Sequence, residues 1–136
     1  MYIMKGIKIV VLLVIVFITS CKEDKCKGGG AGGNLTIKAT TVHHSRSIPG
    51  CTIYVKYNAT EFPGEDVTKY DFSVKADNDK SFAFVSNLTC GEYYFYAVGI
   101  DSLLDPSNWI CKGGIPYSTS QEQDTIAISV PITEGD

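Results

Sequence analysis

Hydrophobic and polar residues alternate with a period of two through most of the chain after residue 33. The apolar positions of these runs are Leu35, Ile37 and Ala39; Ile53, Val55 and Tyr57; Tyr70, Phe72 and Val74; Phe82 and Phe84; and Ile126, Ile128, Val130 and Ile132. Successive side chains of a strand point to opposite faces, so we expect these residues on the buried face of a sheet. Most of them are β-branched or aromatic, as strands favour.

Turn-forming segments separate these runs and set the expected number of strands. They are 47–50, 62–64, 77–80, 105–108 and 112–114, each with Gly, Pro, Asn or Asp. The expected strands are 34–42, 51–58, 68–76, 81–86, 92–100, 108–112 and 125–132. No stretch of ten or more residues has the apolar period of a helix. Short strands at this spacing predict an all-β, seven-stranded sandwich of two sheets.

The strand expected at 92–100 is apolar or aromatic on both faces, which suits a central strand. Tyr54, Tyr94 and Tyr96 have the parity opposite to the core, and Trp109 follows a turn. These four rings form a candidate aromatic surface that would stack on sugars or anchor a protein partner. The alternative, which we favour, is that these rings cover the second face of the sheet or that the central strand is simply buried.

The first 20 residues have the features of a secretory signal peptide. Lys5 and Lys8 precede an uninterrupted apolar run at 9–18, which is shorter than the roughly 20 residues of a membrane-spanning helix. The segment Ile18-Thr19-Ser20-Cys21 resembles the lipobox of bacterial lipoproteins. This resemblance implies cleavage before Cys21 and acylation of Cys21, which would hold the protein on a membrane. The alternative is an ordinary signal peptide followed by an unrelated cysteine.

Three charged residues after the lipobox, Lys22, Glu23 and Asp24, resemble the short acidic export signal of Bacteroidetes lipoproteins. The resemblance implies an outer-membrane protein exposed at the cell surface. The alternatives are a solvated charged tether and a location on the periplasmic leaflet.

Residues 21–33 are expected to form a lipidated tether that precedes a domain of residues 34–136. Lys27–Gly33 is rich in glycine, and such a run behaves as flexible coil. No strand precedes it, so it does not fit a phosphate-binding loop.

Four cysteines remain besides Cys21, namely Cys26, Cys51, Cys90 and Cys111. An even number in an oxidising compartment predicts disulfides, with all three pairings open. Free buried thiols are the main alternative, because no CxxC or CxxH spacing indicates a metal site.

Two segments resemble the carboxypeptidase regulatory-like domains of bacterial surface proteins. Pro49–Val55 looks like their turn-and-strand motif, and Asp77–Phe84 followed by Asn87–Tyr93 is similar to a later turn and strand pair. The resemblance spans 34–132 and implies a Greek-key, transthyretin-like (prealbumin-like) sandwich with no catalytic residues to carry over. The departures from the family's pattern are Cys51, Lys80 and Cys90.

The remaining chemistry favours a binding or structural protein over an enzyme, and we expect no cofactor. The net charge of −3 without a basic cluster argues against nucleic-acid binding, and no serine lies in a G-x-S-x-G elbow. His43 and His44 would reach one metal ion only if a turn begins there, so we expect a solvated loop and no metal. Asp77–Asp79 predicts a plain turn rather than a calcium loop.

Two short patterns, at Asp101-Ser102-Leu103 and Asp124-Thr125-Ile126, resemble the acceptor of Bacteroidetes O-glycosylation and make Ser102 and Thr125 candidate glycosylation sites. Chance occurrence is the alternative for both.

Together these features predict a non-catalytic, lipid-anchored surface module that binds a glycan or a protein partner. The alternative is a structural accessory subunit of an outer-membrane uptake or fimbrial complex. A binding module would purify alone, whereas a subunit would bring stoichiometric partners.

Overall fold

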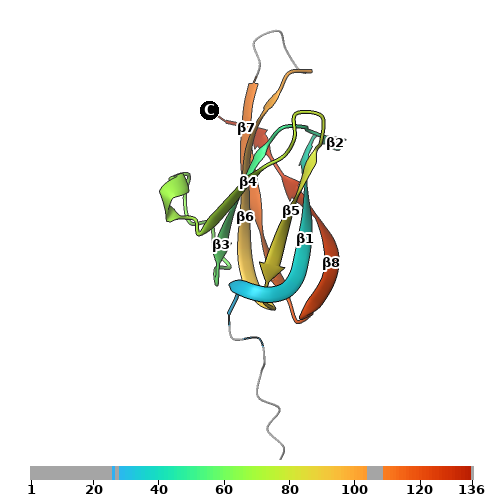
Figure 1. The fold of residues 1–136 in the computed structure, drawn as a ribbon. Coiled ribbons are helices and arrows are strands. Elements are labelled where there is room, and N and C mark those ends of the chain that lie inside the picture. Colours follow the sequence, from blue (N-terminus) through green and yellow to red (C-terminus); the bar gives the residue numbers. More distant parts are fainter. Residues whose placement is uncertain (1–25, 27, 104–108, 136) are drawn as a thin grey trace, which may run out of the picture.

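The computed structural model describes residues 26, 28–103 and 109–135, which form two β-sheets facing each other (Figure 1). The first sheet contains β1 (Ala31–His43), β2 (Arg46–Ser47), β5 (Phe82–Leu88) and β8 (Gln123–Pro131). The second sheet contains β3 (Thr52–Tyr57), β4 (Phe72–Lys75), β6 (Gly91–Asp101), β7 (Trp109–Thr119) and β9 (Thr133–Glu134). A short 3₁₀ turn, η1 (Val67–Lys69), precedes β4. The all-β, two-sheet prediction is confirmed.

In the first sheet, β1 lies between β5 and β8. It pairs antiparallel with β5 and parallel with β8, so that Ile37 lies opposite Val85 on one side and Ile126 on the other. The second sheet has the order β4-β3-β6-β7-β9 and is antiparallel throughout. After β8 the chain crosses from the first sheet to the second, because β9 pairs with β7.

The core lies between the sheets and follows the period of two. The expected residues Leu35, Ile37 and Ala39 of β1 and Ile53 and Val55 of β3 are fully buried. From β6, Tyr93, Phe95 and Ala97 enter the same cluster. Period-two alternation places these side chains on one face, and burial of each large one stabilises the fold by about 1.5–3 kcal/mol.

The expected orientation of β5 is wrong. Phe84 is 51% exposed, whereas Ala83 and Val85 are buried in the core. The register opposite β1 decides this, because Ala39 faces Ala83 and Ile37 faces Val85. The larger rings therefore lie on the outer face, where Lys38 Nζ sits 4.1 Å from the centre of the Phe82 ring.

Among the expected strand boundaries, two differ most from the structure. β7 continues to Thr119, well past the predicted end at residue 112, since its two glycines pair within the sheet opposite β6. The predicted strand at 68–76 begins only at Phe72, because η1 occupies its start. Within the described residues, no helix has the length and apolar character needed to cross a membrane.

The glycine-rich segment is attached to the sandwich rather than extended away from it. Cys26 forms a disulfide with Cys90, and the Tyr93 hydroxyl accepts a hydrogen bond of 2.9 Å from the Gly30 amide. The sheet itself starts at Ala31, before the expected boundary at residue 34. A Cβ on Gly29 would lie 2.1 Å from the Glu92 carbonyl oxygen, so only glycine allows this close approach.

Candidate functional site

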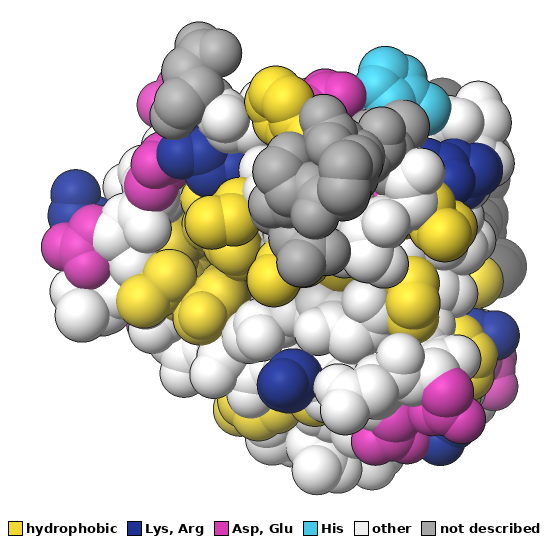
Figure 2. Space-filling view, turned by 90° about the horizontal axis from the view of Figure 1, so that it is seen from above, with side chains coloured by type: hydrophobic (Ala, Val, Ile, Leu, Met, Phe, Trp, Pro, Cys, Tyr) yellow, Lys and Arg dark blue, Asp and Glu magenta, His cyan; other side chains and the backbone are white. Residues whose placement is uncertain are grey.

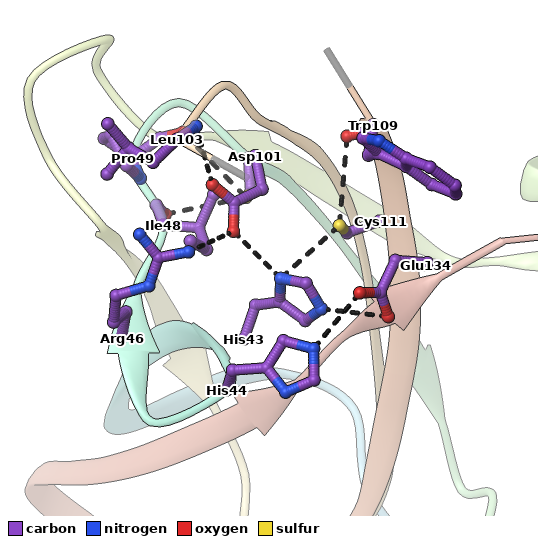
Figure 3. A network of polar contacts seen from close by, with 11 residues as sticks. His43, His44, Arg46, Ile48, Pro49, Asp101, Leu103, Trp109, Cys111 and Glu134 are labelled. Atoms are coloured by element: carbon purple, nitrogen blue, oxygen red, sulfur yellow. Dashed lines mark hydrogen bonds and ion pairs between the residues drawn. The ribbon is translucent and has the colours of Figure 1, made fainter. Parts of the chain in front are cut away.

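The end of the sandwich opposite the Cys26–Cys90 disulfide holds a network of buried polar side chains (Figures 1 and 3). We call it the distal end; it comprises residues 43–48, 100–103, 109–111 and 132–135. His43, the last residue of β1, and Asp101, the last residue of β6, are each only 1% exposed. The network therefore joins the two sheets where the apolar core ends.

Asp101 accepts three interactions. Its Oδ2 lies 2.9 Å from His43 Nδ1 and 3.0 Å from an Arg46 guanidinium nitrogen, and its Oδ1 accepts a 3.0 Å hydrogen bond from the Leu103 amide. The hydrogen bond from His43 is the main cause that lowers the pKa of Asp101. The same bond is the main cause that raises the pKa of His43. Three donors around the carboxylate thus stabilise its ionised form despite burial.

A tight turn brings the second histidine beside the first. His44 and Ser45 have φ values of 45° and 64°, and they connect β1 to β2 as a two-residue hairpin loop with both residues left-handed. Positive φ breaks the strand alternation, so the His44 ring lies 4.2 Å from the His43 ring, centre to centre. The expected solvated loop is only half correct, since His44 is exposed and His43 is buried.

Glu134 of β9 faces both rings (Figure 3). Its Oε2 lies 3.2 Å from His43 Nε2 and its Oε1 lies 3.1 Å from His44 Nε2. The pKa of Glu134 is lowered to about 2, first by a backbone hydrogen bond and then by the one from His44. The carboxylate is therefore ionised at every physiological pH.

Cys111, His43 and Asp101 are close together but do not form a nucleophile-base-acid relay. Cys111 Sγ lies 3.7 Å from His43 Nδ1, the same ring nitrogen that contacts Asp101. In a catalytic relay the nucleophile and the acid use opposite nitrogens of the ring. Burial also raises the pKa of the Cys111 thiol, which disfavours the reactive thiolate.

The distal end also carries exposed apolar side chains at the end of β6, just after it and at the start of β7, with 43 to 76% of each exposed. We call this group the distal patch: Ile100, Leu103, Trp109 and Ile110. Figure 2 looks down on this end and shows hydrophobic side chains over part of the surface, with histidine at the rim. Exposed apolar groups gathered in this way mark interaction surfaces.

The candidate aromatic surface is mostly covered. Tyr94 and Tyr96 are 8% and 2% exposed, because the segment between β3 and β4 lies over them. The Phe62 ring is 5.7 Å from Tyr94 and 5.4 Å from Tyr96, and Tyr70 stacks on Tyr96 at 5.6 Å. These two tyrosines therefore offer no exposed binding surface.

The other expected site residues fall in separate places. Cys21, Lys22, Glu23 and Asp24 lie outside the described residues. The disulfide prediction is confirmed for Cys26 and Cys90, whereas Cys51 and Cys111 are buried free thiols, as the alternative expected. Ser102 and Thr125 are exposed, just after β6 and within β8.

Fold and site together define an all-β, two-sheet domain of about 110 residues whose polar groups gather at one end. A scan against protein-family models, a search of curated proteins and a search of solved structures each find no match to this chain.

Sequence reasoning missed Asp101 and Glu134, although a signal for one of them was present. Asp101 has the same parity as Tyr93 and Phe95 in β6, so the alternation places a carboxylate on the core face. A buried acid requires partners, which is a reason to look for them. Nothing local singles out Glu134, because only the pairing of β9 with β7 brings it to the histidines.

Proposed function

We propose that the protein is a non-catalytic surface module, anchored to the bacterial outer membrane through a lipid on Cys21, that binds a protein partner with its distal end. The observation that carries the proposal is the distal patch. It lies at the opposite end of the sandwich from the disulfide, which is five residues from the proposed lipid (Figure 1). An anchor at one end would direct the other end away from the membrane.

A protein partner fits the distal patch better than a glycan. Three of its four side chains are aliphatic and present no hydrogen-bonding group. Sugars are bound by stacked rings together with polar groups, whereas apolar side chains rimmed by polar residues suit a protein interface. The covering of Tyr94 and Tyr96 removes the principal stacking surface expected for a glycan.

The same proposal includes a relation to the carboxypeptidase regulatory-like domains. In support, Gly50 of the Pro-Gly turn before β3 has a φ of 71° and donates a backbone hydrogen bond to Lys80. A turn residue in this region is best supplied by glycine, as in the family's motif.

A mild-detergent pull-down of the natively expressed protein tests the function. Wild type should recover a protein partner. Phe84→Ser, a matched exposed change on the outer face of β5, should recover the same partner. The double variant Leu103→Ser/Ile110→Ser should lose it, and Cys21→Ser should leave the membrane fraction. Recovery of the partner by the double variant would refute the use of the distal patch. A stoichiometric membrane complex retained by every variant would instead favour an accessory subunit.

A further inference from the structure

We infer that His43, His44 and Glu134 form a binding site for a divalent transition-metal ion of the zinc type at the distal end. The inference is independent of the proposed partner. One ligand atom from each residue can be chosen so that all lie within 4.8 Å of one another (Figure 3). Two imidazoles and one carboxylate are a known ligand set for zinc and leave a fourth position for water.

The distances between the side chains are close to those that a metal requires. Zinc bonds of about 2.0–2.2 Å place neighbouring tetrahedral ligand atoms about 3.2–3.6 Å apart. Glu134 oxygens already lie 3.2 Å from His43 Nε2 and 3.1 Å from His44 Nε2. These contacts are made by the two different oxygens of Glu134, so the carboxylate faces both imidazoles. The three ligand atoms lie within 4.8 Å of one another and would have to close to about 3.2–3.6 Å around a bound ion.

His43 Nε2 is buried and faces the Glu134 carboxylate without an aligned hydrogen bond. It has no hydrogen bond, although the residue is 1% exposed and a Glu134 oxygen is 3.2 Å away. The contact is thus close but not aligned, as expected when a nitrogen and an oxygen both face a third position. A buried ring nitrogen without an aligned hydrogen bond is costly, and a bound ion at this point would satisfy it.

Asp101 has the relation to His43 that carboxylates have to metal-binding histidines. It contacts Nδ1 at 2.9 Å, which leaves Nε2 on the side of Glu134. Such a partner fixes the ring orientation and makes the ligating nitrogen more basic. Arg46 balances the charge of Asp101, so the carboxylate is available to position the ring and is not itself drawn to the metal.

The backbone holds the ligands before any metal arrives. Glu134 pairs with Cys111 of β7, and the Ile132 amide donates a hydrogen bond of 2.9 Å to the Val42 carbonyl. The site therefore lies where the chain crosses between sheets. A bound ion would fasten β1 of the first sheet to β9 of the second.

Zinc binding to the untagged full-length protein in detergent tests the inference. The chain has only two histidines, so both imidazole signals in a nitrogen-15 spectrum report on this site alone. We expect one zinc per chain by equilibrium dialysis, with a shift of both imidazoles. His44→Gln and Glu134→Gln should each weaken binding at least tenfold, and Asp101→Asn by about 10–100-fold.

The control is Glu122→Gln, which changes an exposed carboxylate elsewhere on the domain. It should bind zinc like wild type. His44 and Glu134 are 62% and 37% exposed, so their variants are expected to fold. Absence of stoichiometric zinc at about 0.1 mM total metal, a concentration that would fill even a site with a micromolar dissociation constant, would overturn the inference. Equal affinity in wild type, His44→Gln and Glu134→Gln would overturn it as well.

Discussion

At the scale of single residues, the most informative feature is that two ionisable side chains occupy core-facing positions of their strands. His43 continues the buried series of β1, and Asp101 continues that of β6. An isolated charge at such a position would be strongly destabilising, and here the two groups stabilise each other across the sheets. At the distal end this ion pair occupies the position of an apolar core contact. It also holds the His43 ring toward Glu134.

Replacing Asp101 by Asn tests the strength of this pair. The variant leaves His43 and Arg46 without their buried anion, so we expect the free energy of unfolding to fall by about 3 kcal/mol in urea titrations with chelator present. Asp79→Asn, in an exposed turn, should change it by less than about 0.5 kcal/mol. Equal unfolding midpoints of the two variants would show that the pair adds nothing to stability.

At the scale of elements, the segment between β3 and β4 decides what the outer face of the second sheet can do. It folds back so that Phe62 and Tyr70 cover Tyr96 of β6. The Tyr70 hydroxyl donates a 2.9 Å hydrogen bond to the Gly64 carbonyl. Asp71 Oδ2 accepts a 2.8 Å hydrogen bond from the Tyr57 amide. A surface that the alternation alone would leave open thereby becomes a second, smaller apolar cluster.

This cluster should make the protein sensitive to alkali. Burial is the main cause that raises the pKa values of its tyrosines Tyr70, Tyr94 and Tyr96 above the ordinary 10.0. The fold favours the neutral phenols, so their contribution is complete below pH 10 and is lost as pH rises through the folded pKa values.

We therefore expect the free energy of unfolding to decline above pH 10, with tyrosinate absorbance rising in step with unfolding. Tyr94→Phe removes one titrating group and should make the decline shallower. If the tyrosines ionise at their ordinary pKa while circular dichroism stays native, the rings are not buried as described.

At the scale of the whole molecule, the disulfide and the distal end lie at opposite ends of one sandwich (Figure 1). The parallel pairing of β1 with β8 joins the beginning and the end of the domain within the first sheet. The chain thus enters at one end, and β9 completes the polar network at the other. This arrangement separates the attachment of the protein from the surface proposed to meet a partner.

Removal of the disulfide tests how firmly the entry segment is attached. Cys26 and Cys90 are 64 residues apart, and a crosslink over such a span contributes about 2–4 kcal/mol, chiefly by constraining the unfolded chain. Cys26→Ser/Cys90→Ser should lose this much in urea unfolding and should be cut by protease within the glycine-rich segment. Cys51→Ser, which changes a buried free thiol, should not open that segment. Resistance of the double variant to cleavage would mean that packing alone holds it.

Alternation in the sequence by itself determined the all-β class, the two-sheet arrangement and the core faces of β1, β3 and β6, because period-two burial is a local property of a strand. Tertiary structure alone decided the orientation of β5, where the register with β1 excluded Phe84 from the core. It also decided the covering of Tyr96, the Cys26–Cys90 pairing and the meeting of Glu134 with His43. These depend on contacts between distant segments, which no local pattern encodes.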